Sequence, residues 1–322
     1  MISFELKFTS HFFSLILITE FNFMKIKTLF SMFLLIAISF TISSLRFTSS
    51  VSATDTDEMS IKRGEKIVMN YCALCHGGED GKLSGKMMDD IPKFFGKIHT
   101  ANITNNMEKG IGKYTKDQLR TLLRTRIKAD GKKANMLMPI FPLMADEDIN
   151  GIIDFLKSDR FAVQSSDATY PPQKLKWIGR TFDKKVKIGT MPNKPILLPD
   201  TTNKIEWGKY MVTAVYRCYE CHSGEMIPDD YNPSASKKYL QGGHTMYDME
   251  RKKVKVRNIT PDLKTGIGLW SEDDFYKLIN TGVRKNGKNV RFPMMPLPGL
   301  SRSECNAIYA YLMTVEPIKN KI

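Results

Sequence analysis

The sequence predicts an all-α protein that contains two similar halves joined by a linker. Short strings of residues recur in the same order along the chain, which is the signature of an internal repeat. Each half also has the spacing of capped, amphipathic helices, whereas few stretches alternate apolar and polar residues as strands do. The 322 residues, of which 42% are apolar and 25% charged, suffice for two modest domains with real cores and a leader.

The repeated strings set the domain boundaries. The matching pairs are 61–64 (Ile-Lys-Arg-Gly) with 205–208 (Ile-Glu-Trp-Gly), 102–104 with 258–260 (both Asn-Ile-Thr), 110–112 with 266–268 (both Gly-Ile-Gly), 130–132 with 286–288, and the Met-Pro pairs 138–139 with 295–296. We therefore predict one domain at residues 54–160 and a second at residues 204–322. Residues 161–203 carry several prolines and few helix signals, so they are predicted to be a linker packed on the surface.

Each half is expected to hold three main helices. In the first half, these are a short helix near residues 61–69, a middle helix over 115–126 that opens with a Thr-x-x-Gln capping box, and a last helix that Asp146 caps and that runs through residue 156. The second half repeats the middle and last helices, with Ser271 and Ser301 as their caps. These helices place the motifs described below on helix ends and on the loops between helices.

Residues 1–53 are predicted to be a leader. Two lysines precede an apolar stretch over residues 29–42, and Ala53 ends a small-residue cleavage site, which is the order of a secretory signal peptide. We expect translation to begin at Met24 and cleavage to follow Ala53, which places the mature chain in the periplasm. The alternative is an uncleaved anchor that holds the chain on the inner membrane, facing the periplasm, since the apolar run approaches the ~20 residues of a membrane span.

The chain is basic, with 48 Lys and Arg against 34 Asp and Glu and a formal net charge of +14. Such a surface favours association with acidic partners or with the anionic surface of a membrane, so we expect partners with acidic docking surfaces and peripheral membrane association. The alternative is a lysine-rich composition with no particular partner. The sequence has no zinc-finger spacing and no motif that would enter a nucleic-acid groove, so no nucleic-acid partner is predicted.

The cysteines carry the clearest chemical signal. Four of the five form two Cys-x-x-Cys-His strings, Cys72–Cys75–His76 and Cys218–Cys221–His222. This spacing is the attachment motif for c-type haem, in which the two thiols bond to the vinyl groups and the histidine ligates the iron. A zinc ribbon would need its two Cys pairs much closer together, and a redox-active dithiol would need a βαβ context. The sequence therefore predicts two covalently bound haem c groups.

A methionine is expected on the other face of each iron, because its soft thioether favours Fe(II). Met138 and Met295 lie between the middle and last helices of their halves, and each is followed by a proline that stiffens the loop. We predict these two residues as the sixth ligands. Met136 and Met294 remain alternatives, since their distances from the preceding Asp-Gly or Asn-Gly turn fit equally well.

The second half carries long strings that resemble the class I dihaem cytochromes c. These are Asn-Ile-Thr-Pro-Asp over 258–262, Thr-Gly-Ile-Gly-Leu-Trp-Ser over 265–271, the Met-Pro pair, and Ala-Ile-Tyr-Ala-Tyr-Leu over 307–312. The pattern is similar to the cytochrome subunits of membrane-bound alcohol, gluconate and aldehyde-type dehydrogenases, and it covers roughly residues 57 to 318. The resemblance implies two tandem cytochrome c folds with His/Met ligation. It also implies that the first and last helices cross where Gly64 meets Phe155 and where Gly208 meets Tyr311.

The expected function is single-electron transfer between a donor dehydrogenase and a respiratory acceptor, such as a cytochrome or an oxidase. We predict no catalytic residue and no enzyme activity of the chain's own. The alternative is a dihaem cytochrome c peroxidase, which would need one iron face open and an acid/base group beside it. Both halves keep a Met-Pro pair, which favours the carrier. A haem-based sensor would need an output domain, for which no residues remain.

Overall fold

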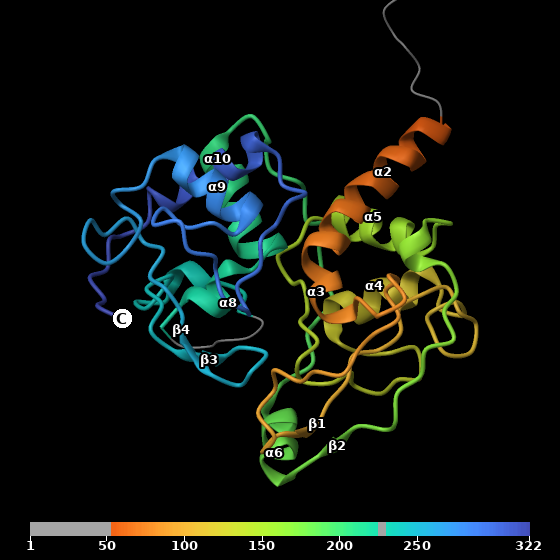
Figure 1. Ribbon diagram of the computed structural model, residues 1–322. Coiled ribbons are helices and arrows are strands. Elements are labelled where there is room, and N and C mark those ends of the chain that lie inside the picture. Colours follow the sequence, from red (N-terminus) through yellow and green to blue (C-terminus); the bar gives the residue numbers. More distant parts are fainter. Residues whose placement is uncertain (1–52, 225–229) are drawn as a thin grey trace, which may run out of the picture. The chain divides into compact units, whose positions relative to one another are not determined.

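This computed structural model describes residues 53–224 and 230–322, so the predicted leader lies outside the described residues apart from Ala53. The described chain is mainly helical (Figure 1). The first half contains α2 (Ala53–Ile67), the π-helical turn η1 (Val68–Cys72), α3 (Ala73–His76), β1 (Gly96–Lys97), α4 (Lys116–Thr125) and α5 (Asp146–Leu156). The expectation of a helical protein with minor strands is confirmed for this part of the chain.

The second half repeats this order of helices. It contains α7 (Lys204–Tyr210), the π-helical turn η3 (Met211–Val215), α8 (Cys218–His222), the 3₁₀ turn η4 (Pro233–Ala235), β3 (Thr245–Tyr247), β4 (Lys253–Lys255), α9 (Glu272–Thr281) and α10 (Arg302–Leu312). The strands β3 and β4 form an antiparallel hairpin in which Met246 pairs with Val254. Residues Thr56–Ile322 cluster as one unit, so contacts between the two halves belong to its interior.

Residues 161–203 are more structured than their prolines suggest. They hold the 3₁₀ turn η2 (Phe161–Val163), β2 (Lys174–Leu175) and α6 (Trp177–Lys185). Strand β2 pairs antiparallel with β1 of the first half, with Gly96 opposite Leu175. The linker is therefore bound along the first half by backbone hydrogen bonds.

The capping signals in the sequence set the helix starts. Thr115 and Ser271 each accept a hydrogen bond from the third backbone N–H of α4 and α9, and the Gln118 and Asp274 side chains return the bond. The start of α5 differs from the prediction: its N-cap is Ala145, which has no side-chain bond, and the Asp146 carboxylate instead pairs with Arg124. The Asp146 carboxylate thus neutralises the buried guanidinium of Arg124 instead of capping the helix.

Two helix crossings depend on glycine. A Cβ added to Gly64 would lie 1.8 Å from the Gly151 carbonyl oxygen, and one added to Gly208 would lie 1.9 Å from the Ala307 carbonyl oxygen. The first and last helices of each half therefore touch backbone to backbone. The crossing expected at Gly208 and Tyr311 is present, whereas Gly64 meets Gly151 rather than Phe155, because two facing glycines allow the closest approach. Within the described ranges, no helix has both the length and the apolar character needed to cross a membrane.

Candidate haem-binding sites

Both Cys-x-x-Cys-His strings lie beside a π-helical turn, although a left-handed Arg217 separates that turn from the second string and nothing separates it from the first. The π-helical turns η1 and η3 come just before α3 and α8, the two short helices of the strings (Figure 1). Such π-helical turns occur often at functional sites. Cys72 and Cys75 are three residues apart on continuous helical backbone, as are Cys218 and Cys221, so each pair of side chains shares one helix face. All four thiols are free, and burial raises the pKa of each.

The two histidines are oriented in the same way. The Nδ1 atoms of His76 and His222 each lie 2.8 Å from a backbone carbonyl oxygen, that of Ala101 and that of Arg257. A carbonyl can only accept, so Nδ1 carries the proton and Nε2 is left as the ligating nitrogen. Burial lowers the pKa of both imidazoles, which favours the neutral form that binds iron.

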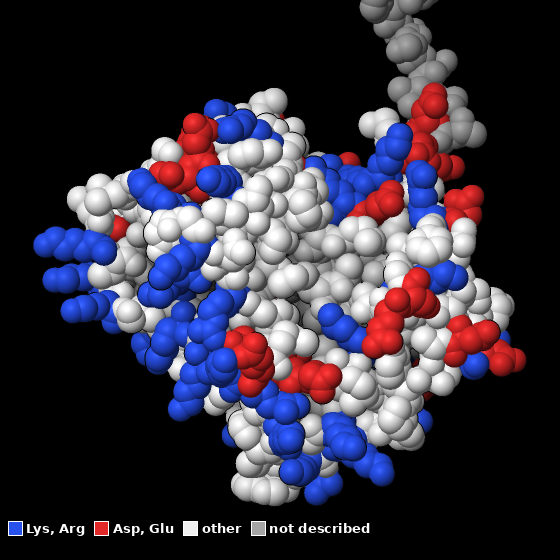
Figure 2. Space-filling view, viewed as in Figure 1, with Lys and Arg blue, Asp and Glu red and all other residues white. Residues whose placement is uncertain are grey.

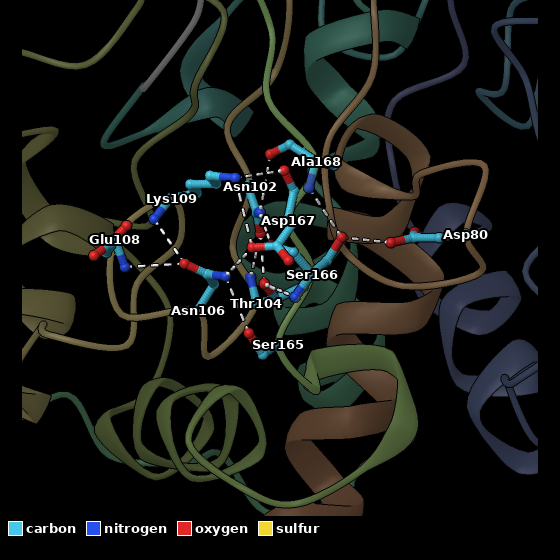
Figure 3. A network of polar contacts seen from close by, with 10 residues as sticks. All are labelled: Asp80, Asn102, Thr104, Asn106, Glu108, Lys109, Ser165, Ser166, Asp167 and Ala168. Carbon is cyan, nitrogen blue, oxygen red and sulfur yellow. Dashed lines mark hydrogen bonds and ion pairs between the residues drawn. The ribbon is translucent and has the colours of Figure 1, made fainter.

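The residue after Ala101 belongs to a network of polar contacts in which Asn102, Thr104 and Ser166 are buried (Figure 3). Ala101 directly precedes Asn102, whose Oδ1 accepts from the backbone N–H and the hydroxyl of Thr104, at 3.0 and 2.6 Å. Asn102 Nδ2 donates to the Ser166 carbonyl at 2.9 Å, and the Ser166 hydroxyl donates to Asp80. The network thus ties the histidine-binding loop to residues that follow η2.

The second half uses the same device with a different partner. Arg257 directly precedes Asn258, whose Oδ1 accepts from the N–H and hydroxyl of Thr260. Asn258 Nδ2 donates at 2.7 Å to the carbonyl of Ile318, near the C-terminal end. The Asn-Ile-Thr strings were visible in the sequence as a repeat, but their role in positioning the histidines was not predicted.

The methionine loops are equivalent in their hydrogen bonds. The backbone N–H of Met138 donates to the Asn135 carbonyl, and that of Met294 donates to the Arg291 carbonyl. Both side chains pack partly buried against the apolar core, whereas Met295 is 38% exposed. By its backbone hydrogen bond, Met294 is the equivalent of Met138 in the second half. By the Met-Pro pattern in the sequence, the equivalent residue is Met295. The two neighbouring methionines of the second half are both within the expected loop.

The residues that lead into the two strings converge on one ring. Tyr71, which precedes Cys72, packs edge-on against Phe141 with centroids 5.7 Å apart. Arg217, which precedes Cys218, lies with its Cζ 5.6 Å from the centre of the same Phe141 ring. Arg217 also pairs with Glu220 inside the second string. The starts of the two attachment sites are therefore joined through Phe141.

The donor set fits covalently bound haem c. Each site offers two free thiols on one helix face and an adjacent imidazole whose Nε2 is left for iron. Among the residues that the structure describes, no three His, Cys, Asp or Glu side chains gather as ligands of a single metal ion would.

Comparison with known proteins gives the class first. Residues 61–159 match the family model of cytochrome c, so this stretch is a cytochrome c domain, and such domains carry covalently bound haem c. The chain is also 30% identical over 80% of its length to the fructose dehydrogenase cytochrome subunit of Gluconobacter japonicus. It is 28% identical over 71% of its length to the cytochrome c subunit of the quinone alcohol dehydrogenase of Gluconobacter oxydans.

A more distant relative extends the same pattern. The gluconate 2-dehydrogenase cytochrome c subunit of Pantoea cypripedii is 23% identical over 83% of the chain, which covers 62% of that protein. The chain spans about half the length of the first two relatives, 52% and 48%. The predicted resemblance to cytochrome subunits of alcohol- and gluconate-type dehydrogenases is confirmed by these matches. All three of these relatives carry the name of a dehydrogenase cytochrome subunit.

Proposed function

We propose that this chain is an exported dihaem c-type cytochrome that passes single electrons from a dehydrogenase to a respiratory acceptor in the periplasm. The observation that carries the proposal is the repeated attachment site: each Cys-x-x-Cys-His string lies at the end of a π-helical turn or just after it, and both histidines donate to the carbonyl before an Asn-Ile-Thr string. The names of the relatives support a dehydrogenase as the donor. The tandem arrangement, with domains at 54–160 and 204–322, follows from the same repeat.

We assign the ligands half by half. In the first half, Cys72 and Cys75 bond the porphyrin, and His76 and Met138 face the iron. The second half uses Cys218, Cys221 and His222 with Met295, and Met294 is the alternative on the hydrogen-bond register. When bound, each haem supplies an iron that accepts and returns one electron. The protein supplies the fixed imidazoles and the loops that hold the thioethers, which leaves no open iron face for peroxide chemistry.

Electrons are proposed to pass directly between the two haems. Tyr71 and Arg217 each precede the first cysteine of a string, and both contact Phe141. The thiol of Cys75 also contributes to the raised pKa of Cys221, which supports a short separation between the two attachment helices. A path between the haems would therefore run through this cluster rather than through solvent.

The charge distribution supports an acidic redox partner at the second haem. The β3–β4 hairpin and the residues after it expose a run of basic side chains, which are Arg251, Lys252, Lys253, Lys255 and Arg257. Figure 2 shows Lys and Arg side chains gathered over this hairpin. Arg257 also provides the carbonyl that orients His222, so the basic surface is continuous with the haem site. Such a surface speeds encounter with acidic proteins and weakens in salt.

The first test is covalent attachment. The purified protein should be heavier than its polypeptide by two haems, and the haem should stay with the protein through acid–acetone extraction. Cys72→Ser and Cys218→Ser should each leave one haem bound through the other half. Haem that extracts into solvent, or a mass increase of a single haem, would overturn the dihaem assignment. A separate assay with hydrogen peroxide tests the alternative. Rapid turnover of peroxide by the wild-type protein would favour the peroxidase.

A further inference from the structure

The two halves differ at the residue that ends the middle helix. Helix α4 ends at Arg126 with φ 70°, and α9 ends at Gly282 with φ 74°. The next backbone bonds match as well, since the carbonyls of both residues accept from an N–H in the following loop. The left-handed conformation suits glycine and strains a side chain, so the arginine must be held by something that the second half lacks.

The Arg126 side chain is fully buried and reaches the methionine loop. Its Nε donates to the Met138 carbonyl at 2.6 Å, and its Nη1 donates to the carbonyl of Lys187 in the linker at 2.9 Å. One rigid guanidinium thus joins the backbone of the predicted ligand to the linker. Asp183, also in the linker, accepts from the Met136 N–H at 2.9 Å, so the same loop is held on both sides.

The second half has no such clamp, because the matching residue, Gly282, has no side chain. A Cβ added to Gly282 would lie 3.2 Å from Val290 Cγ2, with Pro296 also near at 3.7 Å. A side chain at this position would therefore be crowded by Val290, and the backbone of Gly282 meets the loop through the bond from the Val290 N–H alone among the described hydrogen bonds. The backbone hydrogen bonds of the two loops match, so the halves differ in the side chains that hold each loop: Arg126 and Asp183 in the first half, and the Arg291–Asp248 pair in the second.

We propose that Arg126 is a positioning residue for the sixth ligand of the first haem, and that it makes the first iron the more resistant of the two to ligand exchange. The inference rests on the proposed His76/Met138 ligation. A charge-assisted bond to the Met138 carbonyl restrains the loop that must swing away before an external ligand can enter. The fixed positive charge also favours Fe(II) at the first haem. The second haem, without this bond, exchanges its ligand faster.

The test is cyanide binding to the oxidised full-length holoprotein. Wild type should bind in two phases, and Met138→Ala should accelerate the slow one, which assigns that phase to the first haem. Arg126→Gly copies the second half and relieves the backbone strain. It should speed the slow phase by about 10- to 100-fold, the range expected for losing a bond to a charged group. It should also lower the midpoint potential of the first haem.

Arg124→Gln is the matched control. Arg124 is equally buried, two residues earlier, and donates to the Phe141 carbonyl rather than to Met138. It should lower thermal stability while leaving the slow phase unchanged. If Arg126→Gly does not accumulate, Arg126→Lys serves instead, since one ammonium cannot span both carbonyls and should give an intermediate rate. An unchanged slow phase in the Arg126 variant, or an equal acceleration by Arg124→Gln, overturns the positioning role.

Failure of the proposed function would look different. If Met138→Ala alters neither phase, Met138 is not a ligand, and the inference about Arg126 falls with that assignment. If Met138→Ala accelerates one phase and Arg126→Gly does not, the ligation stands and only the role of Arg126 is lost.

Discussion

Single residues decide the chemistry of the two sites. A histidine whose Nδ1 is held by a carbonyl presents a fixed Nε2, and the same geometry at His76 and His222 makes the two sites alike on the proximal side. On the distal side the choice among methionines is still a prediction. In the second half, the Met-Pro pattern favours Met295, and the hydrogen-bond register favours Met294.

Alanine substitutions at the four methionines separate these ligands. Loss of a ligating thioether should remove that haem's weak far-red absorption band of the Fe(III)–methionine bond and allow carbon monoxide to bind the reduced haem, because a soft ligand no longer fills the sixth site. We expect this for Met138→Ala and not for its neighbour Met136→Ala. In the second half we expect it for Met295→Ala. If Met294→Ala removes the band instead, the sixth ligand of the second haem is Met294, and the proposed carrier function is unaffected.

At the scale of elements, each proximal loop depends on a following segment far away in sequence. Asn102 binds the backbone of Ser166, and Asn258 binds the backbone of Ile318. The linker therefore does for the first half what the C-terminal residues do for the second. This explains why residues 161–203 are ordered against the first half although their sequence has few helix signals.

Asn102→Ala should destabilise the first half by about 1–3 kcal/mol, because the buried N–H and hydroxyl of Thr104 and the Ser166 carbonyl each lose a hydrogen bond to Asn102. It should also shift the potential of the first haem, because the Ala101 carbonyl that orients His76 loses its support. Asn258→Ala should do the same in the second half. Thermal unfolding and a potentiometric titration measure the two effects.

Asn105→Ala is the control for this pair. Its Nδ2 also donates to a backbone carbonyl, that of Ser158, but it does not adjoin the histidine-binding residue. It should lower stability slightly and leave both potentials unchanged. Equal shifts in potential from Asn105→Ala and Asn102→Ala would contradict the proposed role of the Asn-Ile-Thr strings.

At the scale of the whole described molecule, the halves are joined by buried polar contacts. The Tyr210 hydroxyl, from α7, donates to the buried Asp148 carboxylate of α5 and accepts from the Ala145 N–H at 2.9 Å. The Asp148 carboxylate also forms an ion pair with Arg63 of α2, and Lys66 of α2 forms one with Glu304 of α10. These contacts hold the two attachment sites in a fixed relation, as the proposed direct transfer between the haems would require.

Tyr210→Phe should lower the free energy of unfolding by about 1–3 kcal/mol, because the Ala145 N–H loses its acceptor and the Asp148 carboxylate one of its donors. It should also slow electron equilibration between the haems if the contact between halves loosens. Calorimetry measures the first effect and flash photolysis the second. Tyr231→Phe is a suitable control, since Tyr231 is 52% exposed and its hydroxyl lies 3.4 and 3.5 Å from the backbone N and the hydroxyl of Thr190.

The same contact predicts a response to high pH. Burial and the neighbouring Asp148 carboxylate raise the pKa of Tyr210 well above its ordinary value of 10.0. The folded protein therefore keeps this phenol protonated when the unfolded chain has lost the proton. Its contribution to stability is complete below pH 10 and is lost as pH rises above that value, by up to about 1.4 kcal/mol per pH unit. Tyr210→Phe should have a shallower loss above pH 10, and an identical slope would contradict this assignment.

The sequence by itself predicts the covalent chemistry of this protein and determines its class. The Cys-x-x-Cys-His strings, the repeat and the capping boxes are local patterns, because neighbouring residues on one helix supply both thiols and the imidazole. Helix positions and the class of protein could be predicted for the same reason. The leader rests on a local pattern too, and it stays a prediction outside the described residues.

Only the tertiary structure decided how the sites are held and how they differ. The carbonyls that orient the histidines lie 25 and 35 residues beyond them, and the bond from Arg126 to Lys187 spans 61 residues. A sequence pattern cannot show which distant backbone group meets a side chain, because burial and chain path set that pairing. The halves that look alike in sequence are therefore made unequal by one arginine and a linker, through contacts that exist only in the folded chain.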